Sequence, residues 1–563
     1  MKVCDLPYKR CDVDVVRAAY ETAAEKIKNA GSAVEVLAAR KQLLDVLEEL
    51  NTQYSLAYVR WSCNTKDDFY KAEKEYYEQK MPELSGVQID YIKAMENTPY
   101  KNEVEKALPK PVYKGYEVSL KALDERIIPE LQEESAIVNE YSQFMSEFTV
   151  DFRGEKLPLT VLKRYMGDPD RDTRREAYDA LGKVFEENSE ILDGTYDRLV
   201  KVRDRMAKKM GYKNYVELGY YRMGRICYDR DMVEKFRENV LSDIVPVVSR
   251  IRTERAKEMG IDDLKLYDYG VCFADGDPQP VLNAKQMFDA GRDMYHEMNK
   301  ETGEFIDMMI ENDAFDVLSR EGKWGGGYCT EFSKYKQPFI LANFNGTSGD
   351  VDVLTHEAGH AFASYLAFKN DLDPEAPLGM ETAETHSMSM EFFCWKFIDK
   401  FFKDRANDYK YKHLFDSLSF LTYGTIVDAF QHVVYEHPEL TPAERNAEWN
   451  KLEAKFRPYL NTKGMRYFEK GTRWQYQMHI YESPFYYIDY CLAQSNALQF
   501  LFASLSDYDD AFKRYYKFTS HYGTELFTDM LKEAGINSPF EKGALKKVAD
   551  ESEKVLKKLS GKM

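Results

Sequence analysis

The stretch His356-Glu357-Ala358-Gly359-His360 is the most informative part of this 563-residue chain. On a helix, residues four positions apart lie on one face about one turn from each other, so both imidazoles can reach the same ion. Neutral imidazole nitrogens are good Zn²⁺ ligands, and a carboxylate beside the first His can take a proton from an attacking water. The pattern is typical of a zinc-dependent peptidase, with His356 and His360 as metal ligands and Glu357 as general base.

The residues around this motif have the spacing of a buried amphipathic helix. Apolar residues recur at intervals of three and four, namely Val351, Leu354, Ala358, Ala361, Phe362 and Tyr365. Thr347, Ser348 and Asp350 stand where a helix N-cap is expected. The alternative is an accidental match on a solvated helix face. We disfavour it, because two unpaired histidines are costly on a face that packs against a core.

A catalytic zinc site also needs a third protein ligand and an open position for water. Prolines and a glycine interrupt the chain between residues 374 and 379, and a second helix is expected from about residue 382 to 402. Glu384 and Glu391 lie seven residues apart on one face of that helix. One can bind the metal while the other accepts a hydrogen bond from a liganding imidazole. Glu381 competes for the ligand role, and ordinary helix-surface charge is the alternative for Glu381 and Glu391.

Three segments together resemble a known enzyme family. They are the block 356–360, the block Glu384-Thr-His-Ser-Met-Ser-Met-Glu391 and the segment His479-Ile-Tyr-Glu-Ser-Pro-Phe-Tyr-Tyr-Ile-Asp-Tyr490. Their order and spacing are similar to those of M3-family zinc metallopeptidases of the oligoendopeptidase F and Pz-peptidase type, with thimet oligopeptidase as a more distant relative. The total length also suits this family. The resemblance implies that Glu384 is the third zinc ligand and that Glu391 is the acid behind a liganding His, with Glu381 as the alternative to Glu384.

Phenol and imidazole donors follow in the last of these segments. Ser483-Pro484 is a good helix start, so a helix is expected from residue 485 to about 502, with His479 in the loop before it. Tyr486 and Tyr490 then lie one turn apart on one face. Donors of this kind, aimed at the tetrahedral oxyanion of peptide hydrolysis, contribute roughly 3 kcal/mol for one well-placed group.

The resemblance assigns these donors to catalysis without deciding which tyrosine acts. In the family, a His and one or two Tyr of this segment stabilise the oxyanion, which implies His479, Tyr486 and Tyr490 here. The thimet-type pattern has glycines between the His and the first Tyr, where this chain has Glu482-Ser483-Pro484. Tyr487 therefore stays an alternative. Simple packing is another, because the chain has 41 tyrosines.

A short apolar run before the motif predicts a strand. Residues 339–344, Phe-Ile-Leu-Ala-Asn-Phe, are bounded by Pro338 and by Asn345-Gly346, which is typical of a strand that ends in a turn. In zinc peptidases of this kind, an edge strand beside the zinc helix pairs with the extended substrate through main-chain hydrogen bonds. The resemblance implies that role for Ala342 and Asn343. The glycines at 325–327 are expected to form a loop that adjusts around a peptide, with a plain hairpin or linker as the alternative.

Length and hydrophobic patterning predict a mostly α-helical fold with few strands. The chain exceeds the size of one ordinary core, so two or more lobes are expected. Charged amphipathic segments dominate its first part, for example Asp14–Asn29, Val34–Leu50, Lys66–Lys80 and Arg171–Phe185. The resemblance implies two helical lobes around a deep substrate channel, with a small β-sheet next to the H-E-x-x-H helix. We assign residues 1–200 to the N-terminal lobe and residues 201–563 to the zinc catalytic lobe.

Charge and hydropathy exclude several kinds of partner. A net charge of −18 argues against nucleic acid, because phosphate binding needs a basic surface. No apolar run approaches the ~20 residues of a membrane span, and the N-terminal residues have no stretch of signal length. The eight cysteines are scattered without a C-x-x-C pair, so reduced thiols are expected. We therefore expect a cytoplasmic protein with no membrane and no nucleic-acid partner.

Together these patterns predict a zinc-dependent endopeptidase with one Zn²⁺ per chain. A zinc site at the base of a channel admits only short, flexible chains, so the expected substrates are oligopeptides cut at internal bonds. One alternative is a metal-dependent carboxypeptidase, which needs a cationic group for the terminal carboxylate of its substrate. The other is a catalytically degenerate peptide-binding protein. The sequence indicates no oligomeric state.

Overall fold

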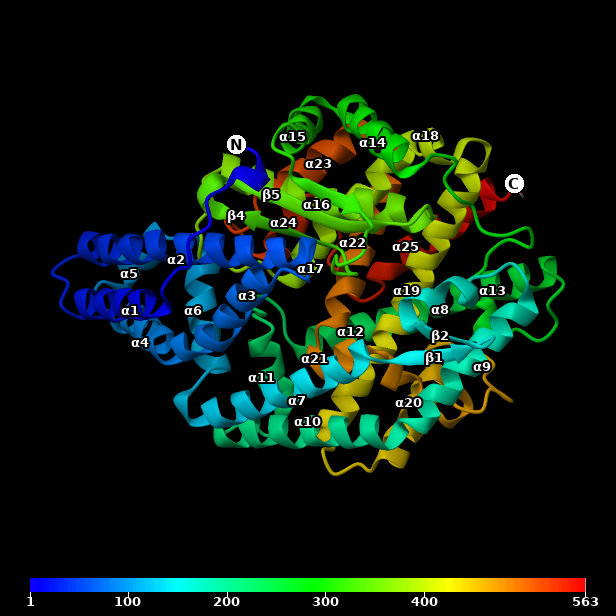
Figure 1. Ribbon diagram of the computed structural model, residues 1–563, viewed down its shortest axis with the longest axis horizontal. Coiled ribbons are helices and arrows are strands. Elements are labelled where there is room, and N and C mark those ends of the chain that lie inside the picture. The colour runs from blue at the N-terminus through cyan, green and yellow to red at the C-terminus, as the bar shows by residue number, and fades with distance from the viewer. Residues whose placement is uncertain (562–563) are drawn as a thin grey trace.

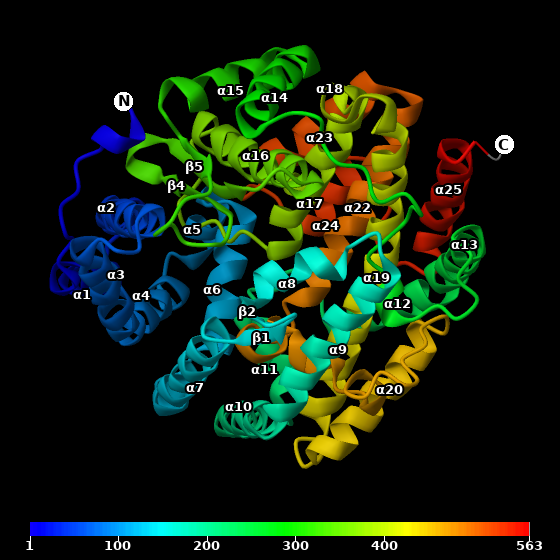
Figure 2. The same cartoon turned by 45° about the vertical axis from the view of Figure 1, so that its right-hand side comes forward.

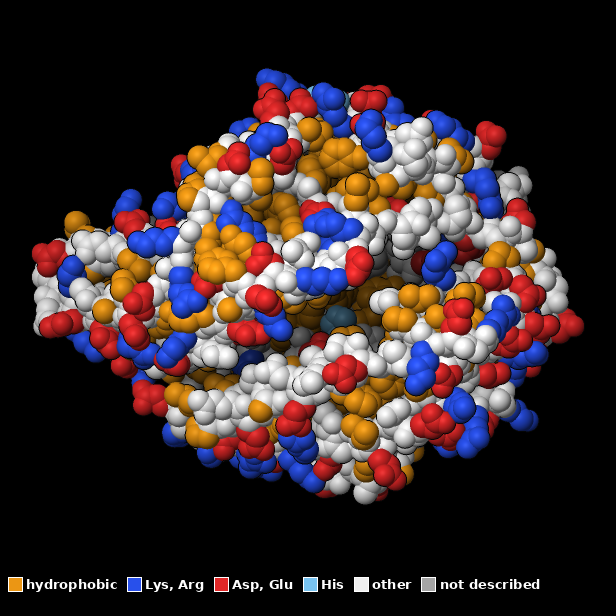
Figure 3. Space-filling view, in the orientation of Figure 1, with side chains coloured by type: hydrophobic (Ala, Val, Ile, Leu, Met, Phe, Trp, Pro, Cys, Tyr) orange, Lys and Arg blue, Asp and Glu red, His pale blue; other side chains and the backbone are white. Residues whose placement is uncertain are grey.

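Helices make up nearly all of the regular structure. The computed structural model describes residues 1–561, and over these residues it has twenty-five α-helices and five short strands (Figure 1). The expected mostly α fold is confirmed. The same face viewed with all its atoms is hollowed near the middle, and hydrophobic side chains and a histidine lie at the floor of the hollow (Figure 3).

The first helices pack around a small core of their own. It is formed by buried residues between Val13 and Tyr116. The predicted helices at 14–29, 34–50 and 66–80 are present, and the second of them continues to Cys63. The helices of this part are α1 (Val13–Lys28), α2 (Ala33–Cys63), α3 (Asp68–Lys80), α4 (Ser85–Asn97), α5 (Lys101–Ala107) and α6 (Lys110–Ala122).

A second, larger core runs through the rest of the chain up to the C-terminal helix. The predicted helix at 171–185 is α9. The lobe boundary near residue 200 stays a prediction. The elements up to the sheet are α7 (Ile128–Ser146), β1 (Thr149–Phe152), β2 (Glu155–Pro158), α8 (Leu159–Met166), α9 (Arg171–Glu187), α10 (Ser189–Lys209), α11 (Tyr215–Arg222), α12 (Arg230–Asn239), α13 (Val245–Glu258), α14 (Ala284–Met298) and α15 (Lys300–Glu311).

The remaining helices follow the three-stranded sheet in the sequence, and the first of them carries the H-E-x-x-H motif. They are α16 (Ser348–Lys369), α17 (Met380–Phe393), α18 (Asp399–Phe402), α19 (Ala406–Glu436), α20 (Pro442–Phe456), α21 (Met478–Glu482), α22 (Tyr487–Ser506), α23 (Tyr508–Ser520), α24 (Phe527–Glu533) and α25 (Ala544–Leu559). The motif lies on α16, whose N-cap residue is Thr347. The second predicted helix, 382–402, is α17 followed by a 3₁₀ turn and the short α18.

A three-stranded sheet lies against α16. Its strands are β3 (Phe315–Leu318), β4 (Tyr328–Phe332) and β5 (Gln337–Phe344), in the order β3-β5-β4. The central strand β5 pairs parallel with β3 and antiparallel with β4. On the other side of the sheet, α2 of the N-terminal part lies next to β4 in both views (Figure 2). The small sheet expected beside the H-E-x-x-H helix is therefore present.

The predicted strand 339–344 exists, but the expectation that it is an edge strand is wrong. It belongs to β5, which has a neighbour on each side. The carbonyl of Ala342 accepts a hydrogen bond from Lys323 Nζ at 2.5 Å, and the side-chain Nδ2 of Asn343 donates to the carbonyls of Trp324 and Gly326. A strand buried on both faces is an unbroken apolar run, so the sequence already carried the signal of a central strand.

An ion-pair cluster ties the small N-terminal core to the loop between α16 and α17. Arg40 on α2 is only 5% exposed and contacts the carboxylates of Asp373 at 2.5 Å and Glu375 at 2.8 Å. Tyr91 on α4 and Tyr116 on α6 donate hydrogen bonds to the same Glu375 carboxylate. A buried cluster of this kind is strongly destabilised when one partner is removed, so it holds the loop between these two helices in place.

The structure also bears on the expectations about membrane spans and cysteines. Within residues 1–561, no helix has both the length and the apolar composition that a membrane crossing requires. All eight cysteines lie in this range and are free thiols.

Candidate metal centre

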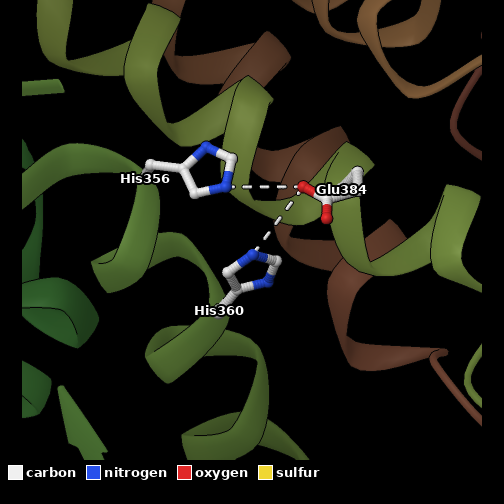
Figure 4. A group of neighbouring side chains, drawn as sticks. All are labelled: His356, His360 and Glu384. Atoms are coloured by element: carbon white, nitrogen blue, oxygen red, sulfur yellow. Dashed lines mark ion pairs between the residues drawn. The ribbon is translucent and has the colours of Figure 1, made fainter. Parts of the chain in front are cut away.

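Three ligand atoms converge from two helices. His356 and His360 on α16 point toward the carboxylate of Glu384 on α17 (Figure 4). Glu384 Oε2 lies 3.4 Å from His356 Nε2 and 3.8 Å from His360 Nε2. One ligand atom from each of the three residues lies within 4.8 Å of the others. Two imidazoles and one carboxylate form a donor set that suits Zn²⁺ and related divalent ions.

Gly359, inside the motif, lets the two helices approach closely enough to build this cluster. A Cβ atom at Gly359 would lie 2.6 Å from the Cα of Ser387 and 3.0 Å from the carbonyl oxygen of His386. Real side chains do not tolerate such contacts with backbone. Any other residue at this position would push α17 away and carry Glu384 out of reach of the imidazoles.

Glu381, the alternative third ligand, lies in a different environment. Tyr228 contacts both Glu381 Oε2 at 3.1 Å and Asp489 Oδ1 at 2.9 Å through its hydroxyl oxygen. A phenol has one proton to donate, so one of these two acids must itself be protonated. Asp489 is paired with Arg225 at 2.8 Å, and burial raises the pKa of Glu381 to about 7, so Glu381 is the one of the two acids that takes up a proton as the pH falls to neutral and below. Glu384 is the one of the two that lies against the histidines.

Behind the cluster, a chain of hydrogen bonds fixes the tautomer of His356. His356 Nδ1 lies 2.6 Å from Glu391 Oε1, and His413 Nε2 lies 2.8 Å from Glu391 Oε2. Trp395 Nε1 donates to His413 Nδ1 at 2.9 Å. An indole nitrogen can only donate, so Nδ1 of His413 is the acceptor and its Nε2–H donates to Glu391. Glu391 then also accepts from His356 Nδ1–H, so the neutral form of His356 has its lone pair on Nε2, facing Glu384.

The pKa of Glu391 reflects this position. Burial alone would raise it, but hydrogen bonds from His356 and His413 outweigh burial and lower the pKa to about 2. Glu391 is therefore a permanent carboxylate, as an acceptor for two imidazoles must be. No sequence pattern singled out His413, because it lies on α19 and its contact with Glu391 arises only from helix packing.

Glu357 is not one of the three ligand residues, and its carboxylate lies beside strand β4 of the sheet. Burial raises its pKa to about 6, although the backbone N–H of Cys329, and the positive charge of His356 when that ring is protonated, favour the ionised form. Cys329 belongs to β4. The N–H of its cross-strand partner Ile340 donates to Ala314 on the β3 side. In an antiparallel ladder this makes Cys329 and Ile340 a non-hydrogen-bonded pair, so the main-chain groups of Cys329 point to the free edge.

The edge beside the motif is therefore β4, which the sequence analysis did not identify as a strand. It directly follows the glycines at 325–327, so the run expected to be a loop leads into the exposed edge. An edge strand offers unpaired N–H and C=O groups to an extended chain. The main-chain N–H of Cys329 on this strand bonds to the Glu357 carboxylate, whereas the carbonyl of Ala342 accepts from Lys323 and the side-chain amide of Asn343 donates to the glycine-rich segment.

His479 lies on the short helix α21, so the expectation that it is in a loop is wrong. Gln477 Nε2 lies 2.7 Å from His479 Nδ1, and Tyr423 donates to Gln477 Oε1 at 2.9 Å. With the amide oriented in this way, Nδ1 of His479 is an acceptor and Nε2 carries the proton. Burial lowers the pKa of His479, so its ring is neutral with one free N–H donor.

The three tyrosines of the late segment point in two directions. Tyr486 donates a hydrogen bond to Glu384 Oε1 at 3.2 Å, and the rings of Tyr486 and Tyr490 are 4.8 Å apart. Tyr487 packs instead against Phe420 and Tyr423 on α19, at ring distances of 5.6 and 5.9 Å. Tyr486 and Tyr490 are thus the pair on the side of the metal ligands.

The helix carrying these tyrosines begins two residues later than predicted. Residue Phe485, where Ser483-Pro484 was expected to start the helix, has a φ of +68°. This left-handed conformation is strained for a bulky residue. Its N–H donates to Gln431 and its carbonyl accepts from Arg225 at 2.6 Å, so tertiary contacts hold the backbone there. They override the local capping signal, and α22 starts at Tyr487.

Fold and site together define the class of this protein: a helical peptidase whose H-E-x-x-H helix packs beside a small sheet at the floor of a hollow. The model of peptidase family M3 matches residues 164–550, and that of the peptidase M3 N-terminal domain matches residues 4–123. The chain belongs to peptidase family M3, and within it to the oligoendopeptidase F type.

Individual relatives agree with this assignment. Oligopeptidase PepF of Bacillus subtilis is 22% identical over 525 residues, which cover 87% of this chain and 76% of that protein. The solved structure of Pz peptidase A with inhibitor 2 is 39% identical, with a TM-score of 0.93 over the whole of both chains. That of oligoendopeptidase-F from Enterococcus faecium, 16% identical with a TM-score of 0.65 over 97% of this chain and 98% of that one, has the same fold.

Proposed function

We propose that this peptidase is a zinc-dependent endopeptidase that cuts internal bonds of short oligopeptides. The observation that carries the proposal is the convergence of His356, His360 and Glu384 next to the partly buried carboxylate of Glu357. This donor set fits one Zn²⁺ per chain, since catalytic zinc sites use three N and O ligands and keep one position open. The names oligopeptidase and oligoendopeptidase of its relatives support oligopeptides as substrates.

Glu357 and Glu391 have different roles in the proposed reaction. Bound Zn²⁺ supplies Lewis acidity, which polarises the scissile carbonyl and makes a water more acidic. Glu357 takes the proton of the attacking water and passes it to the leaving amine. Its pKa of about 6 makes it a stronger base than an exposed Glu, yet leaves it ionised at neutral pH. Glu391 holds His356 in the tautomer whose Nε2 is free to bind.

The free edge of β4 is the proposed docking line for the substrate main chain. It replaces Ala342 and Asn343, whose main-chain and side-chain groups are engaged with Lys323 and the glycine-rich segment. An extended peptide that pairs with Cys329 would run past Glu357. Main-chain pairing needs an unfolded, extended segment, which favours short flexible chains over folded proteins.

His479, with Tyr486 and Tyr490, is the proposed donor set for the oxyanion. We expect His479→Phe to lower kcat about 100-fold, because one N–H donor to the developing negative charge is lost. The zinc content should stay at that of the unmodified protein, because His479 does not touch the three ligands. Steady-state kinetics and metal analysis on the same preparations check both points.

Tyr481→Phe is the matched control from the same segment. Its hydroxyl is buried and makes no hydrogen bond within the described residues, so its loss should leave kcat within about twofold. Equal kcat values for His479→Phe and the unmodified protein would remove His479 from the mechanism.

His413 is expected to act on the metal through Glu391. His413→Phe removes the hydrogen bond to Glu391 Oε2 and should weaken zinc affinity roughly 10- to 100-fold, the range found for outer partners of metal ligands. Competition with a chromophoric chelator measures this without any turnover. His386→Phe is the control, since His386 is buried among aromatic rings and its Nε2 has no partner within residues 1–561. An unchanged zinc affinity in His413→Phe would show that the hydrogen bond from His413 to Glu391 does not contribute to metal binding.

A mixed peptide library tests the function itself. The purified protein is incubated with the library, with and without a chelator, and the products are mapped by mass spectrometry. Internal cuts that disappear with the chelator are the expected result. Trimming from the C-terminus would favour the carboxypeptidase alternative, and no cleavage would favour a peptide-binding protein.

A further inference from the structure

Phe485 lies between the two halves of the proposed donor set and has an unusual backbone conformation. His479 precedes it on α21, and Tyr486 and Tyr490 follow it. Its φ of +68° is left-handed, which costs free energy for a residue with a bulky side chain. A residue keeps such a conformation only where its surroundings enforce it. The contacts around Phe485 must therefore supply this free energy.

Two buried polar side chains hold the main chain of Phe485 on both sides. Its N–H donates to the side chain of Gln431 at 2.9 Å, and its carbonyl accepts from Arg225 at 2.6 Å. Gln431 is completely buried, and Arg225 is only 5% exposed. Arg225 is itself fixed, because it also donates to Asp489 on α22 at 2.8 Å. Any rotation of Phe485 would leave buried polar groups without partners, which is costly.

The ring of Phe485 is enclosed by aromatic side chains, and one glycine makes room for it. The ring centre lies 5.0 Å from that of His432 and 5.4 Å from those of Tyr220 and Tyr435. A Cβ atom at Gly219 on α11 would lie 2.6 Å from Cδ2 and 2.7 Å from Cε2 of Phe485. These distances are far shorter than a van der Waals contact. Since the ring is packed on its other sides, a side chain at position 219 must displace Phe485.

A displacement of Phe485 would move groups at the metal centre. Tyr486 is the next residue, the N-cap of α22, and its hydroxyl donates to Glu384 Oε1 at 3.2 Å. Tyr490 lies one turn further along the same helix. The direction in which α22 starts therefore sets the positions of both phenols. Misplacement of a catalytic group by about 1 Å can cost on the order of 100-fold in rate.

The half of the donor set that contains His479 is held by a second buried arginine. Arg203 is completely buried and donates to the carbonyl of Tyr481 at 2.6 Å. Its other nitrogens donate to Glu134 at 2.6 Å and to the hydroxyl of Tyr435 at 2.8 Å. One buried guanidinium thus fixes a carbonyl on each side of the bend between α21 and α22, and the donor segment is held in a single conformation.

We propose that Phe485 and the side chains that hold it position Tyr486 and Tyr490 for oxyanion stabilisation, and that they thereby set the turnover rate. We call this group the Phe485 clamp; its members are Phe485, Arg225, Gln431 and Gly219. The proposal rests on the proposed endopeptidase function and adds positioning residues to it. No member of the clamp belongs to the three ligand residues, so its effect falls on kcat and not on zinc affinity.

Gly219→Ala tests the clamp from a helix that carries no residue of the metal centre. The added methyl group displaces the Phe485 ring, so we expect kcat to fall at least about tenfold. KM and zinc affinity should stay within about twofold, because an interaction made only in the transition state affects kcat and kcat/KM equally. Gly194→Ala on α10 is the matched control. Apart from its own helix, nothing lies within 4 Å of the added Cβ, so kcat should be retained.

A phosphinic peptide separates misplaced donors from a loss of folded protein. Its tetrahedral phosphorus carries oxygens that mimic the oxyanion, so it binds to the same donors as the transition state. A partly unfolded sample has fewer active molecules, but its folded fraction binds the inhibitor normally. Displaced donors weaken binding in every molecule. The inhibition constant should therefore rise at least about tenfold in Gly219→Ala and stay unchanged in Gly194→Ala.

Gln431→Leu is an independent second variant. It removes the acceptor of the Phe485 N–H with a side chain of similar size, and it decides the question if Gly219→Ala does not fold. Circular dichroism and zinc content show whether each variant is folded and loaded. Unchanged kcat and inhibitor affinity in the folded variants would overturn the clamp while leaving the peptidase function intact. Failure of the unmodified protein to cut any peptide would instead refute the proposed function.

Discussion

Replacing Glu357 by Gln is expected to lower kcat about 10³-fold while zinc stays bound. Gln has nearly the shape of Glu but cannot accept a proton, and general acid–base groups typically contribute 10²- to 10⁴-fold. Glu357 lies outside the set of three ligand atoms, so the affinity for the metal should be close to that of the unmodified protein. Stopped-flow or steady-state kinetics with a quenched fluorescent peptide measures the loss.

Metal analysis on the same samples excludes a trivial cause. If Glu357→Gln loses its zinc, the fall in kcat says nothing about the base. If it keeps both its zinc and near-normal kcat, another group takes the proton and the proposed mechanism is wrong.

Replacing Glu384 by Gln is expected to weaken zinc affinity by more than 100-fold and to abolish turnover with it. Loss of a direct carboxylate ligand should exceed the roughly 10- to 100-fold effect expected for an outer partner. The carboxylate of Glu384 also accepts a hydrogen bond from the Tyr486 hydroxyl, so the substitution also weakens the contact that positions Tyr486. Chelator competition gives the affinity, and kinetics at saturating zinc give the turnover.

Glu381→Gln is a closely matched control on the same helix. Burial raises the pKa of Glu381 to about 7, so below neutral pH its carboxyl is mostly protonated and Gln resembles that neutral form in charge and shape. We therefore expect near-normal zinc affinity and kcat. A reversed result, with Glu381→Gln losing the metal and Glu384→Gln retaining it, would assign the ligand role to Glu381.

The parts of the fold that the sequence predicted are those governed by local pattern. Helix α16 was readable from its 3.6-residue periodicity, and its start from Thr347. The charged helices of the N-terminal part were readable for the same reason. The seven-residue spacing of Glu384 and Glu391 placed both on one helix face and so made each a candidate ligand. The family resemblance then favoured Glu384, with Glu381 as the alternative.

The missed features depend on tertiary contacts. His413 gains its importance from a hydrogen bond to Glu391 on another helix, and no local pattern marks it. The left-handed backbone of Phe485 is held by Gln431 and Arg225, which lie far away in sequence. The edge strand β4 directly follows three glycines. Glycines are rare in strands, so the secondary-structure propensity of this segment predicted a loop and not the strand that lies beside Glu357.

The most direct test of the account is a crystal structure of the Glu357→Gln variant with zinc and an uncleaved oligopeptide, using anomalous scattering at the zinc edge. The account predicts one zinc peak per chain, within about 2.0–2.2 Å of His356 Nε2, His360 Nε2 and a Glu384 oxygen. It also predicts a peptide main chain paired with β4. A zinc peak bound at Glu381 and Asp489, or a peptide lying elsewhere, would contradict it.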